Sequence, residues 1–349
     1  MNGSGSLISR LKAFWYIGAE SRELESRPLA ATIMGERLVF FRAGDGSPRA
    51  LLDRCAHRGM ALSRGRVRRD GLECPYHGWR YDGDGRCLEV PALADGAPPP
   101  RASVRAFPCA ERDGYIWVYM GNCPPSSSPP HLDGAGEPGW TTFRMKTRFQ
   151  AGVLACLENF LDCPHTVYVH RGWFRNSRPR PARARVERYS DRVLVRFFGE
   201  RDPRSAVSRL LFPRRAEMGH TDCFLMPATS RVEYSFGPRR RFIITSQCTP
   251  VSPDETEVYT LIAFRFGAVG PLVRLLFEPL SRIIIRQDVE ILRLQGEQVR
   301  HFGDGPLVST SADVFGPEIV RLWQSAVESG TDAGKHGAPL ETRDVVLRF

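Results

Sequence analysis

Four residues in the first quarter of the chain have the types and spacing of a metal site. The sequence reads Cys55-Ala-His57 and, after sixteen intervening residues, Cys74-Pro-Tyr-His77. Thiolates and imidazoles both bind zinc and iron, so these two loops predict a four-ligand site. Zinc fingers usually pair Cys with Cys and His with His. Here each loop supplies one of each, which favours a 2Fe-2S cluster with Cys55 and Cys74 on one iron and both histidines on the other.

A second group of metal-binding side chains lies in the segment Asp162-Cys-Pro-His165-Thr-Val-Tyr-Val-His170. Two neutral imidazoles and one carboxylate, with open coordination positions, form the ligand set of a non-haem iron(II) that binds oxygen. On a regular helix, residues five apart point about 140° away from each other, so the two rings would not converge. Pro164 disfavours helical backbone at Cys163, and a break there would turn both rings toward one point.

The carboxylate that completes this set is predicted to be Asp288, in a helix near the C-terminal end. Its neighbours one turn away on either side are all apolar: Ile284, Ile285, Ile291 and Leu292. The carboxylate therefore points into an apolar face, where an unpaired charge is costly. A buried aspartate can also pair with an arginine, but two histidines that lack a carboxylate favour a metal ligand. The remaining histidines, His220 among them, have no partners at metal-ligand spacing and are interpreted as ordinary residues.

The elements that must hold these residues lie on either side of a polar segment. Residues 1–120 predict an antiparallel β domain, because short β-like runs separated by Gly, Asp and Pro extend from residue 14 to residue 120. Residues 121–140 are rich in Pro, Ser and Gly and predict a linker. Residues 141–328 predict an α+β domain and residues 329–349 a tail. The expected elements of the second domain are a helix at 151–162, strand-like alternation at 183–198, 221–236, 241–251 and 255–266, and a long helix from Pro279 to Val299.

The composition, with 42% hydrophobic and 25% charged residues in 349, is that of a globular protein of about two domains. The net charge of +10 comes from 46 Arg against 3 Lys, and their spread along the chain argues against nucleic-acid binding. Four charged residues interrupt the longest apolar stretch, 261–285, so it does not predict a membrane span. Without a signal-peptide core, a cytoplasmic location is expected, where the nine cysteines would be thiols or metal ligands.

At these residues the chain resembles the Rieske non-haem iron oxygenases, which include ring-hydroxylating α subunits and shorter monooxygenases. The resemblance runs from the CxH and CxxH loops through the DxxHxxxxH segment to Gln287-Asp288. It implies one Rieske 2Fe-2S cluster on the first four residues. It also implies one mononuclear Fe(2+) on His165, His170 and Asp288, beside a substrate held by a helix-grip sheet. Asp162 would be the catalytic bridging acid, between His77 of one subunit and an iron-ligating histidine of the next in a homotrimer.

The resemblance further implies the reaction and its partners. Electrons would come from NAD(P)H through a separate reductase or a ferredoxin, since the chain has no GxGxxG turn and no further ferredoxin cysteine set. O2 is the cosubstrate, and the chain length favours monooxygenases that hydroxylate or demethylate a small apolar or aromatic compound. Aromatic-ring dihydroxylation and desaturation by the same metals stay open. So do a Rieske electron-transfer protein without oxygenase activity and a zinc-dependent nucleic-acid binder.

Overall fold

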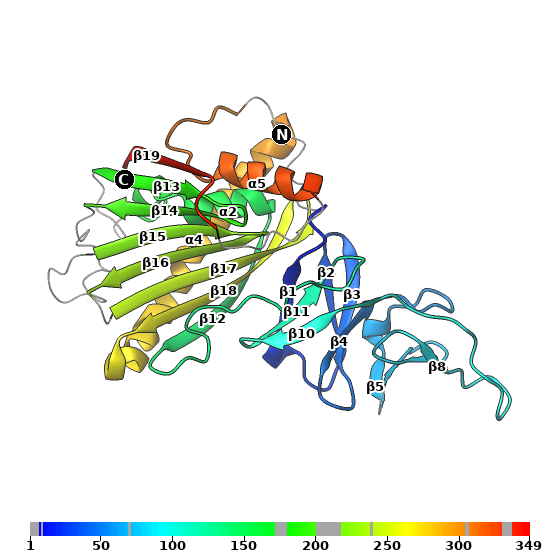
Figure 1. Ribbon diagram of the computed structural model, residues 1–349. Coiled ribbons are helices and arrows are strands. Elements are labelled where there is room, and N and C mark those ends of the chain that lie inside the picture. Colours follow the sequence, from blue (N-terminus) through cyan, green and yellow to red (C-terminus); the bar gives the residue numbers. More distant parts are fainter. Residues whose placement is uncertain are drawn as a thin grey trace. The chain divides into compact units, whose positions relative to one another are not determined.

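The chain forms two compact units in the computed structural model, which describes residue 7 and residues 10–68, 71–171, 180–199, 218–237, 240–303, 307–329 and 337–349. One unit is Lys12–His131, and the other is Met1–Leu11 together with Leu132–Phe349. Within the described residues, the first unit contains three sheets and the second contains one, and Figure 1 labels most of their elements. The boundary falls inside the segment predicted as a linker, where the structure has no helix or strand between Tyr119 and Thr141.

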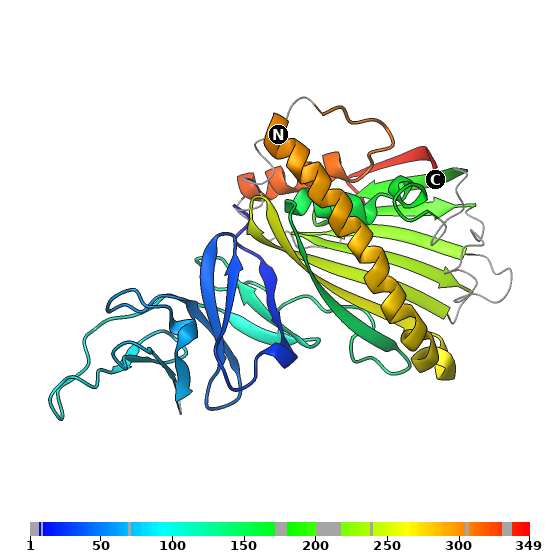
Figure 2. The same cartoon turned by 180° about the vertical axis from the view of Figure 1, so that it is seen from behind.

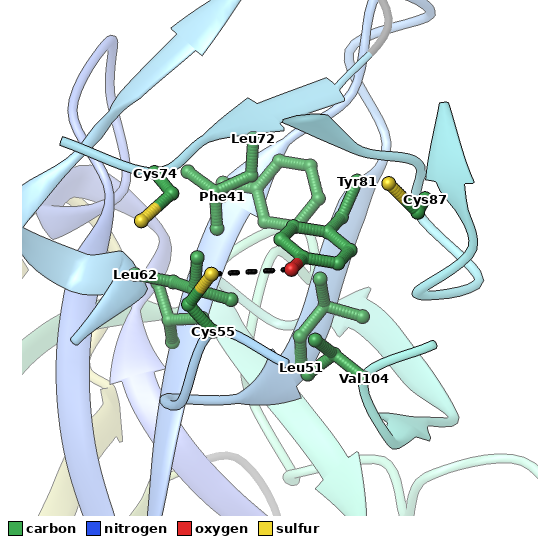
Figure 3. Packing of buried hydrophobic residues seen from close by; sticks show 10 residues of the cluster. Phe41, Leu51, Cys55, Leu62, Leu72, Cys74, Tyr81, Cys87 and Val104 are labelled. Carbon is green, nitrogen blue, oxygen red and sulfur yellow. Dashed lines mark hydrogen bonds between the residues drawn. The ribbon is translucent and has the colours of Figure 1, made fainter. Parts of the chain in front are cut away.

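The first unit is built from short antiparallel strands in three sheets, ordered β1-β11-β10, β2-β3-β4-β9 and β5-β6-β7-β8. Apolar side chains of the second and third sheets pack together, and both cysteines of the predicted cluster belong to this core (Figure 3). The elements are β1 (Trp15–Glu20), η1 (Ser21–Glu23), β2 (Leu29–Ile33), β3 (Glu36–Arg42), β4 (Pro48–Leu52), η2 (Leu62–Arg64), β5 (Arg66–Arg68), β6 (Gly71–Glu73), β7 (Arg80–Tyr81), β8 (Cys87–Glu89), β9 (Ala106–Phe107), β10 (Cys109–Arg112) and β11 (Tyr115–Tyr119).

The second unit is an eight-stranded antiparallel sheet, ordered β12-β18-β17-β16-β15-β14-β13-β19. Figure 2 shows α2 and α4 on one face of it, with α4 crossing the strands obliquely. The α+β fold class expected from the sequence is confirmed. The elements are β12 (Thr141–Phe149), α2 (Val153–Leu161), η3 (Pro164–Val167), β13 (Pro181–Arg188), β14 (Arg192–Phe198), β15 (Met218–Leu225), β16 (Thr229–Phe236), β17 (Arg240–Ser252), β18 (Glu255–Arg265), η4 (Gly267–Val269), α4 (Gly270–Phe302), α5 (Gly316–Ser329) and β19 (Glu341–Arg348). No described helix has the length and apolarity to span a bilayer.

The long helix α4 begins nine residues earlier than predicted, at Gly270 rather than at Pro279. A proline inside a helix removes the hydrogen bond to the carbonyl four residues before it. That carbonyl belongs to Leu275, whose side chain is 71% exposed, so this turn of the helix faces solvent and water can replace the lost donor. The expectation that Pro279 starts the helix was therefore wrong. Pro271, in the first turn, is the proline that marks the start.

The predicted tail contributes a strand to the second unit. β19 pairs with β13 along its whole length, from Pro181 opposite Arg348 to Arg188 opposite Glu341. The C-terminal Phe349 packs its ring edge against Phe197, with 5.5 Å between the centroids. The end of the chain is therefore part of the sheet.

A buried carboxylate connects this added strand to α5. Glu318 in α5 is 3% exposed and lies within 3.0 Å of Arg321, 3.2 Å of Arg188 on β13 and 3.5 Å of Arg343 on β19. We expect Glu318→Gln to lower the free energy of unfolding by about 2–3 kcal/mol, because three arginines then lose their common counter-charge. Thermal unfolding followed by circular dichroism measures this. Glu328→Gln, on an exposed turn of the same helix, is the control, and an equal effect of both changes would contradict the prediction.

Candidate metal centres

The two loops of the predicted cluster have the same backbone construction. In each loop the cysteine amide donates to the carbonyl five residues on, and the amide of a glycine four residues on donates back to the cysteine carbonyl. The distances are 2.8 and 2.9 Å for Cys55 with Met60 and Gly59, and 2.8 and 3.1 Å for Cys74 with Trp79 and Gly78. Both glycines have positive φ, 72° and 70°, a conformation that is strained for other residues. Two turns of one design thus present the four predicted ligands.

The sulfurs lie inside the unit and the imidazoles lie toward its surface. Cys55 and Cys74 are each 2% exposed, while His57 is half-buried and His77 is exposed. The two rings lie with 4.7 Å between their centroids, and His57 stacks on Trp79. Burial first, and then the neighbouring Cys55 sulfur, raises the pKa of Cys74. The thiolate form of Cys74 is therefore disfavoured unless a cation lies beside it, and the structure brings together all four predicted residues.

Tyr81 is a member of this site that the sequence did not indicate. Its hydroxyl lies 3.1 Å from Cys55 Sγ, the contact drawn as a dashed line in Figure 3. The same oxygen accepts a hydrogen bond from the Ala56 amide at 3.1 Å, which leaves its own hydrogen for the sulfur. Burial and the contact with Cys55 raise the pKa of Tyr81, so the hydroxyl stays protonated and acts as a donor.

The second predicted site is assembled by a break in the chain after α2. The helix ends at Leu161, and Asp162 takes an extended conformation with φ −89° and ψ 100°. The chain restarts as the short helix η3 from Pro164 to Val167. The break therefore falls one residue before the position expected, because Cys163, which precedes the proline, has helical φ −63° and ψ −38°. This turn brings His165 toward His170.

His165, His170 and Asp288 converge at one point. The Nε2 atoms of the two histidines are 3.3 Å apart, and Asp288 Oδ1 lies 3.0 Å from Nε2 of His170 and 3.7 Å from that of His165. His170 and Asp288 are buried. Asp288 Oδ1 is shielded from solvent and accepts no hydrogen bond within the described part of the chain. Sequence reasoning thus placed three side chains from two distant segments together.

The hydrogen bonds at Nδ1 of His165 and His170 determine which atoms of the two rings face the point where the three side chains converge. His165 Nδ1 contacts the carbonyl oxygen of Asp162, and His170 Nδ1 lies 2.8 Å from Oε1 of Gln287. Both partners are acceptors, so each Nδ1 carries the hydrogen and each Nε2 presents a lone pair. Burial lowers the pKa of His170, but its contacts with Asp288 and Gln287 outweigh burial and raise it, because the carboxylate favours a positive charge beside it. Two lone pairs and one carboxylate oxygen fit a divalent metal ion. Gln287 was not expected here.

Asp162 lies beside this site, as predicted. Its Oδ2 accepts a hydrogen bond from the His165 amide at 3.2 Å and lies 3.8 Å from His165 Nδ1. The side chain is 42% exposed, so it can also meet a group from outside the unit. Burial, as the largest cause, raises its pKa to about 6.

A second buried cluster of potential ligands, Cys163, His220 and Asp222, lies in the same unit. Cys163 Sγ donates to Asp222 Oδ2 at 3.3 Å, and His220 Nε2 lies 2.9 Å from Asp222 Oδ1. Each carboxylate oxygen is thus hydrogen-bonded, unlike Asp288 Oδ1. The expectation that His220 lacks such partners was wrong, because Asp222 lies two residues away on the same strand and Cys163, the third member, is distant in the sequence. The contacts within this cluster are those of a hydrogen-bonded group.

Two protein families match the chain. The Rieske 2Fe-2S domain matches residues 14–108, and the vanillate O-demethylase oxygenase C-terminal domain matches residues 149–329, more than half of the chain. The chain belongs to the Rieske oxygenase family. The resemblance drawn from the two sequence motifs is thereby confirmed, and the first unit of this Rieske oxygenase is a Rieske 2Fe-2S domain.

Similar proteins agree with this assignment. This Rieske oxygenase is 36% identical over 163 residues to the putative toluene-4-sulfonate monooxygenase iron-sulfur subunit TsaM2 of Comamonas testosteroni, covering 46% of each chain. It is 37% identical over 160 residues to the dicamba O-demethylase oxygenase component of Stenotrophomonas maltophilia, covering 45% of this chain and 47% of that one. These matches thus span about half the length of the relatives. Among solved structures, Pseudomonas putida CBB5 NdmA with caffeine has a TM-score of 0.77 at 25% identity over 92% of both chains.

Proposed function

We propose that this chain is the terminal component of a monooxygenase that hydroxylates or oxidatively demethylates an apolar or aromatic organic compound with O2. Its Rieske cluster would be held by Cys55, His57, Cys74 and His77, and one mononuclear Fe(2+) by His165, His170 and Asp288. The two metal groups supply one-electron transfer and O2 activation when bound. The observation that supports this most is the convergence of two imidazole lone pairs with a buried carboxylate oxygen.

The protein's own groups would prepare this site. The Asp162 carbonyl and Gln287 Oε1 hold the two imidazoles in the tautomer that directs Nε2 inward. Asp288 supplies the one negative charge among the three ligands, from a helix that also covers the sheet. Three protein ligands leave other coordination positions for O2 and for a nearby substrate.

The substrate class is supported by the relatives and by the sheet. The relatives described above are named for reactions with toluene-4-sulfonate and dicamba, both of which are aromatic. On the sheet face under α4, an aromatic row runs across neighbouring strands: Phe197, His220, Tyr234 and Phe242. The ring of Phe242 also meets Phe277 of α4, which places the row on the helix-covered face. A monooxygenase acting on an aromatic methyl ether, methylamine or ring fits this setting.

Asp162 and His77 are proposed to act between subunits. Each residue is accessible in its own unit, Asp162 beside an iron ligand and His77 at the exposed end of the Rieske loops. A carboxylate that bonds both imidazoles would connect the Rieske site of one chain to the iron site of the next, which requires a closed ring such as a homotrimer. Electrons would enter from a separate NAD(P)H-dependent reductase or a ferredoxin, in the cytoplasm.

Metal analysis tests this function. We expect about three irons and two acid-labile sulfides per chain, a Rieske EPR signal after dithionite reduction, and turnover of an aromatic test compound with NADH and a surrogate reductase. About two irons in protein supplied with iron(II), without turnover, would instead favour an electron-transfer protein. Zinc in place of iron would contradict the proposal.

The Tyr81 hydroxyl should set the potential of the cluster. A donor to Cys55 Sγ stabilises the reduced, more negative cluster, so we expect Tyr81→Phe to lower the reduction potential. A difference of about 1 kcal/mol between the two oxidation states corresponds to about 40 mV for one electron. Redox titration followed by EPR measures the shift. Tyr76→Phe, an exposed tyrosine beside His77, should leave the potential unchanged, and equal potentials in both variants would count against the hydrogen bond.

A further inference from the structure

The hydrogen-bonded cluster of Cys163, Asp222 and His220 connects the sheet to the segment that carries the proposed iron ligands. Cys163 lies between Asp162 and His165, whereas Asp222 and His220 lie on β15. All three are buried, at 7%, 1% and 2% exposure. The function proposed above gives Cys163 and Asp222 no role, although Cys163 is only two residues from His165. The burial of the Asp222 carboxylate at this place requires an explanation.

The strand side of this cluster is held firmly. His220 and Asp222 are two residues apart on β15, so both side chains lie on the same sheet face. The His220 ring stacks between Phe197 and Tyr234, its cross-strand neighbours, with 4.3 Å to each centroid and near-parallel planes. Its Nε2 then lies 2.9 Å from Asp222 Oδ1. This leaves Oδ2 of the same carboxylate directed at Cys163.

The loop side of the cluster is in a conformation that the sequence disfavours. Cys163 precedes Pro164 and yet has helical φ −63° and ψ −38°. Steric conflict with the proline ring normally drives this position toward extended backbone. Two local bonds support the observed turn, since Thr166 donates from its amide and its hydroxyl to the Cys163 carbonyl. The thiol also donates a hydrogen bond to Asp222 on β15, beyond the loop, at 3.3 Å.

We propose that Asp222 is a positioning residue for the iron site and acts through Cys163. The carboxylate, fixed by His220, holds the thiol and with it the helical turn before Pro164. This helical turn then directs Nε2 of His165 toward His170 and Asp288. This inference rests on the proposed iron site and adds to it a contact through which the sheet orients a ligand. Its prediction is that a hydrogen-bond donor at position 163 determines the metal affinity of a site that it does not touch.

The test is the affinity of the mononuclear site for Co(II), measured by chelator competition on full-length protein with its Rieske cluster loaded and its mononuclear site emptied. Cys163→Ala removes the donor, and we expect Co(II) to bind about 10-fold more weakly, the lower end of the range for loss of a group that bonds a metal ligand directly. Cys163→Ser restores a donor and should recover affinity to within about threefold of wild type. Asp222→Asn should weaken binding, and adding Cys163→Ala to it should have little further effect, because the two residues act as one unit.

Cys223→Ala is the matched control. Cys223 is a buried cysteine next to Asp222 on β15, but it points to the other face of the sheet and its thiol contacts the Phe224 carbonyl. It should lose stability without losing Co(II) affinity. Unchanged affinity in Cys163→Ala, or no recovery in Cys163→Ser, would overturn the positioning role. The iron site itself is refuted if wild type binds no Co(II), or if Asp288→Ala leaves Co(II) binding unchanged. The two failures are therefore distinguishable.

Discussion

Asp288→Ala should remove the mononuclear iron and with it all oxygenation, while the Rieske domain stays loaded. Iron should fall from about three to about two per chain with the sulfide content unchanged. Outer partners of metal ligands typically contribute 10- to 100-fold to metal affinity or activity. Loss of a direct ligand that carries the only negative charge in the set should exceed that range, so turnover is expected to fall at least about 100-fold. Iron analysis and product formation with a surrogate reductase measure both effects.

The same helix provides the control for this change. Glu290 is two residues away on the solvent face of α4, where it pairs with Arg293 at 2.7 Å. Glu290→Ala removes a carboxylate from the helix without touching the site and should retain iron and turnover. Asp288→Asn keeps the shape of the side chain without its charge, and it should behave like the alanine variant. Full turnover in Asp288→Asn would contradict the role of the carboxylate as a metal ligand.

The sequence indicated the residues of both proposed metal sites because metal ligands have distinctive types and spacing. The CxH and CxxH loops are local, so Cys55 and His77 could be grouped without knowledge of the fold. Asp288 could be added because a single carboxylate among isoleucines on one helical face requires a partner. The structure brings it within 3.0 Å of His170, over more than a hundred residues of sequence.

The supporting partners could not be predicted, since they depend on which strands and turns become neighbours. Tyr81 reaches Cys55 because β7 packs beside the first loop, and tyrosine alone carries no spacing signal. His220 was interpreted as an ordinary residue because Cys163, its partner through Asp222, is far away in the sequence. At both places a loop packs against a strand, and only the complete fold brings these groups together. Pairing register, unlike ligand type, is a property of the whole fold.

Local rules also failed at two prolines, for a physical reason common to both. Pro279 was expected to start α4 and lies inside it, on an exposed turn where water can replace the missing amide. Pro164 was expected to drive Cys163 out of helical backbone, but the contacts with Asp222 and Thr166 hold it there. Proline preferences amount to a few kcal/mol or less, and solvent exposure or a few hydrogen bonds can offset them.

Mixed assemblies of two inactive variants should recover activity if electrons cross between subunits. A chain with Cys74→Ser lacks the Rieske cluster but keeps the iron ligands, and a chain with Asp288→Ala has the opposite defect. Each alone should be inactive. In a head-to-tail ring assembled at random from equal amounts of the two chains, each interface joins the Rieske site of one chain to the iron site of the next. Both of these sites are intact with a probability of about one half times one half. Co-expressed chains should therefore turn over at about a quarter of the wild-type rate.

Transfer within one chain leads to the opposite expectation, because no chain in the mixture has both sites. No recovery in mixed trimers, with their composition verified by mass spectrometry and their size by light scattering, would exclude the bridge between Asp162 and His77 of the partner chain. Adding Asp162→Asn to the Cys74→Ser chain supplies a sharper control. In each active pair of neighbouring subunits, this change affects only the subunit whose iron site receives the electron, so it should abolish the recovered activity. Asp162→Asn in the Asp288→Ala chain should leave the recovered activity unchanged. This asymmetry arises only if the carboxylate acts in the subunit that receives the electron.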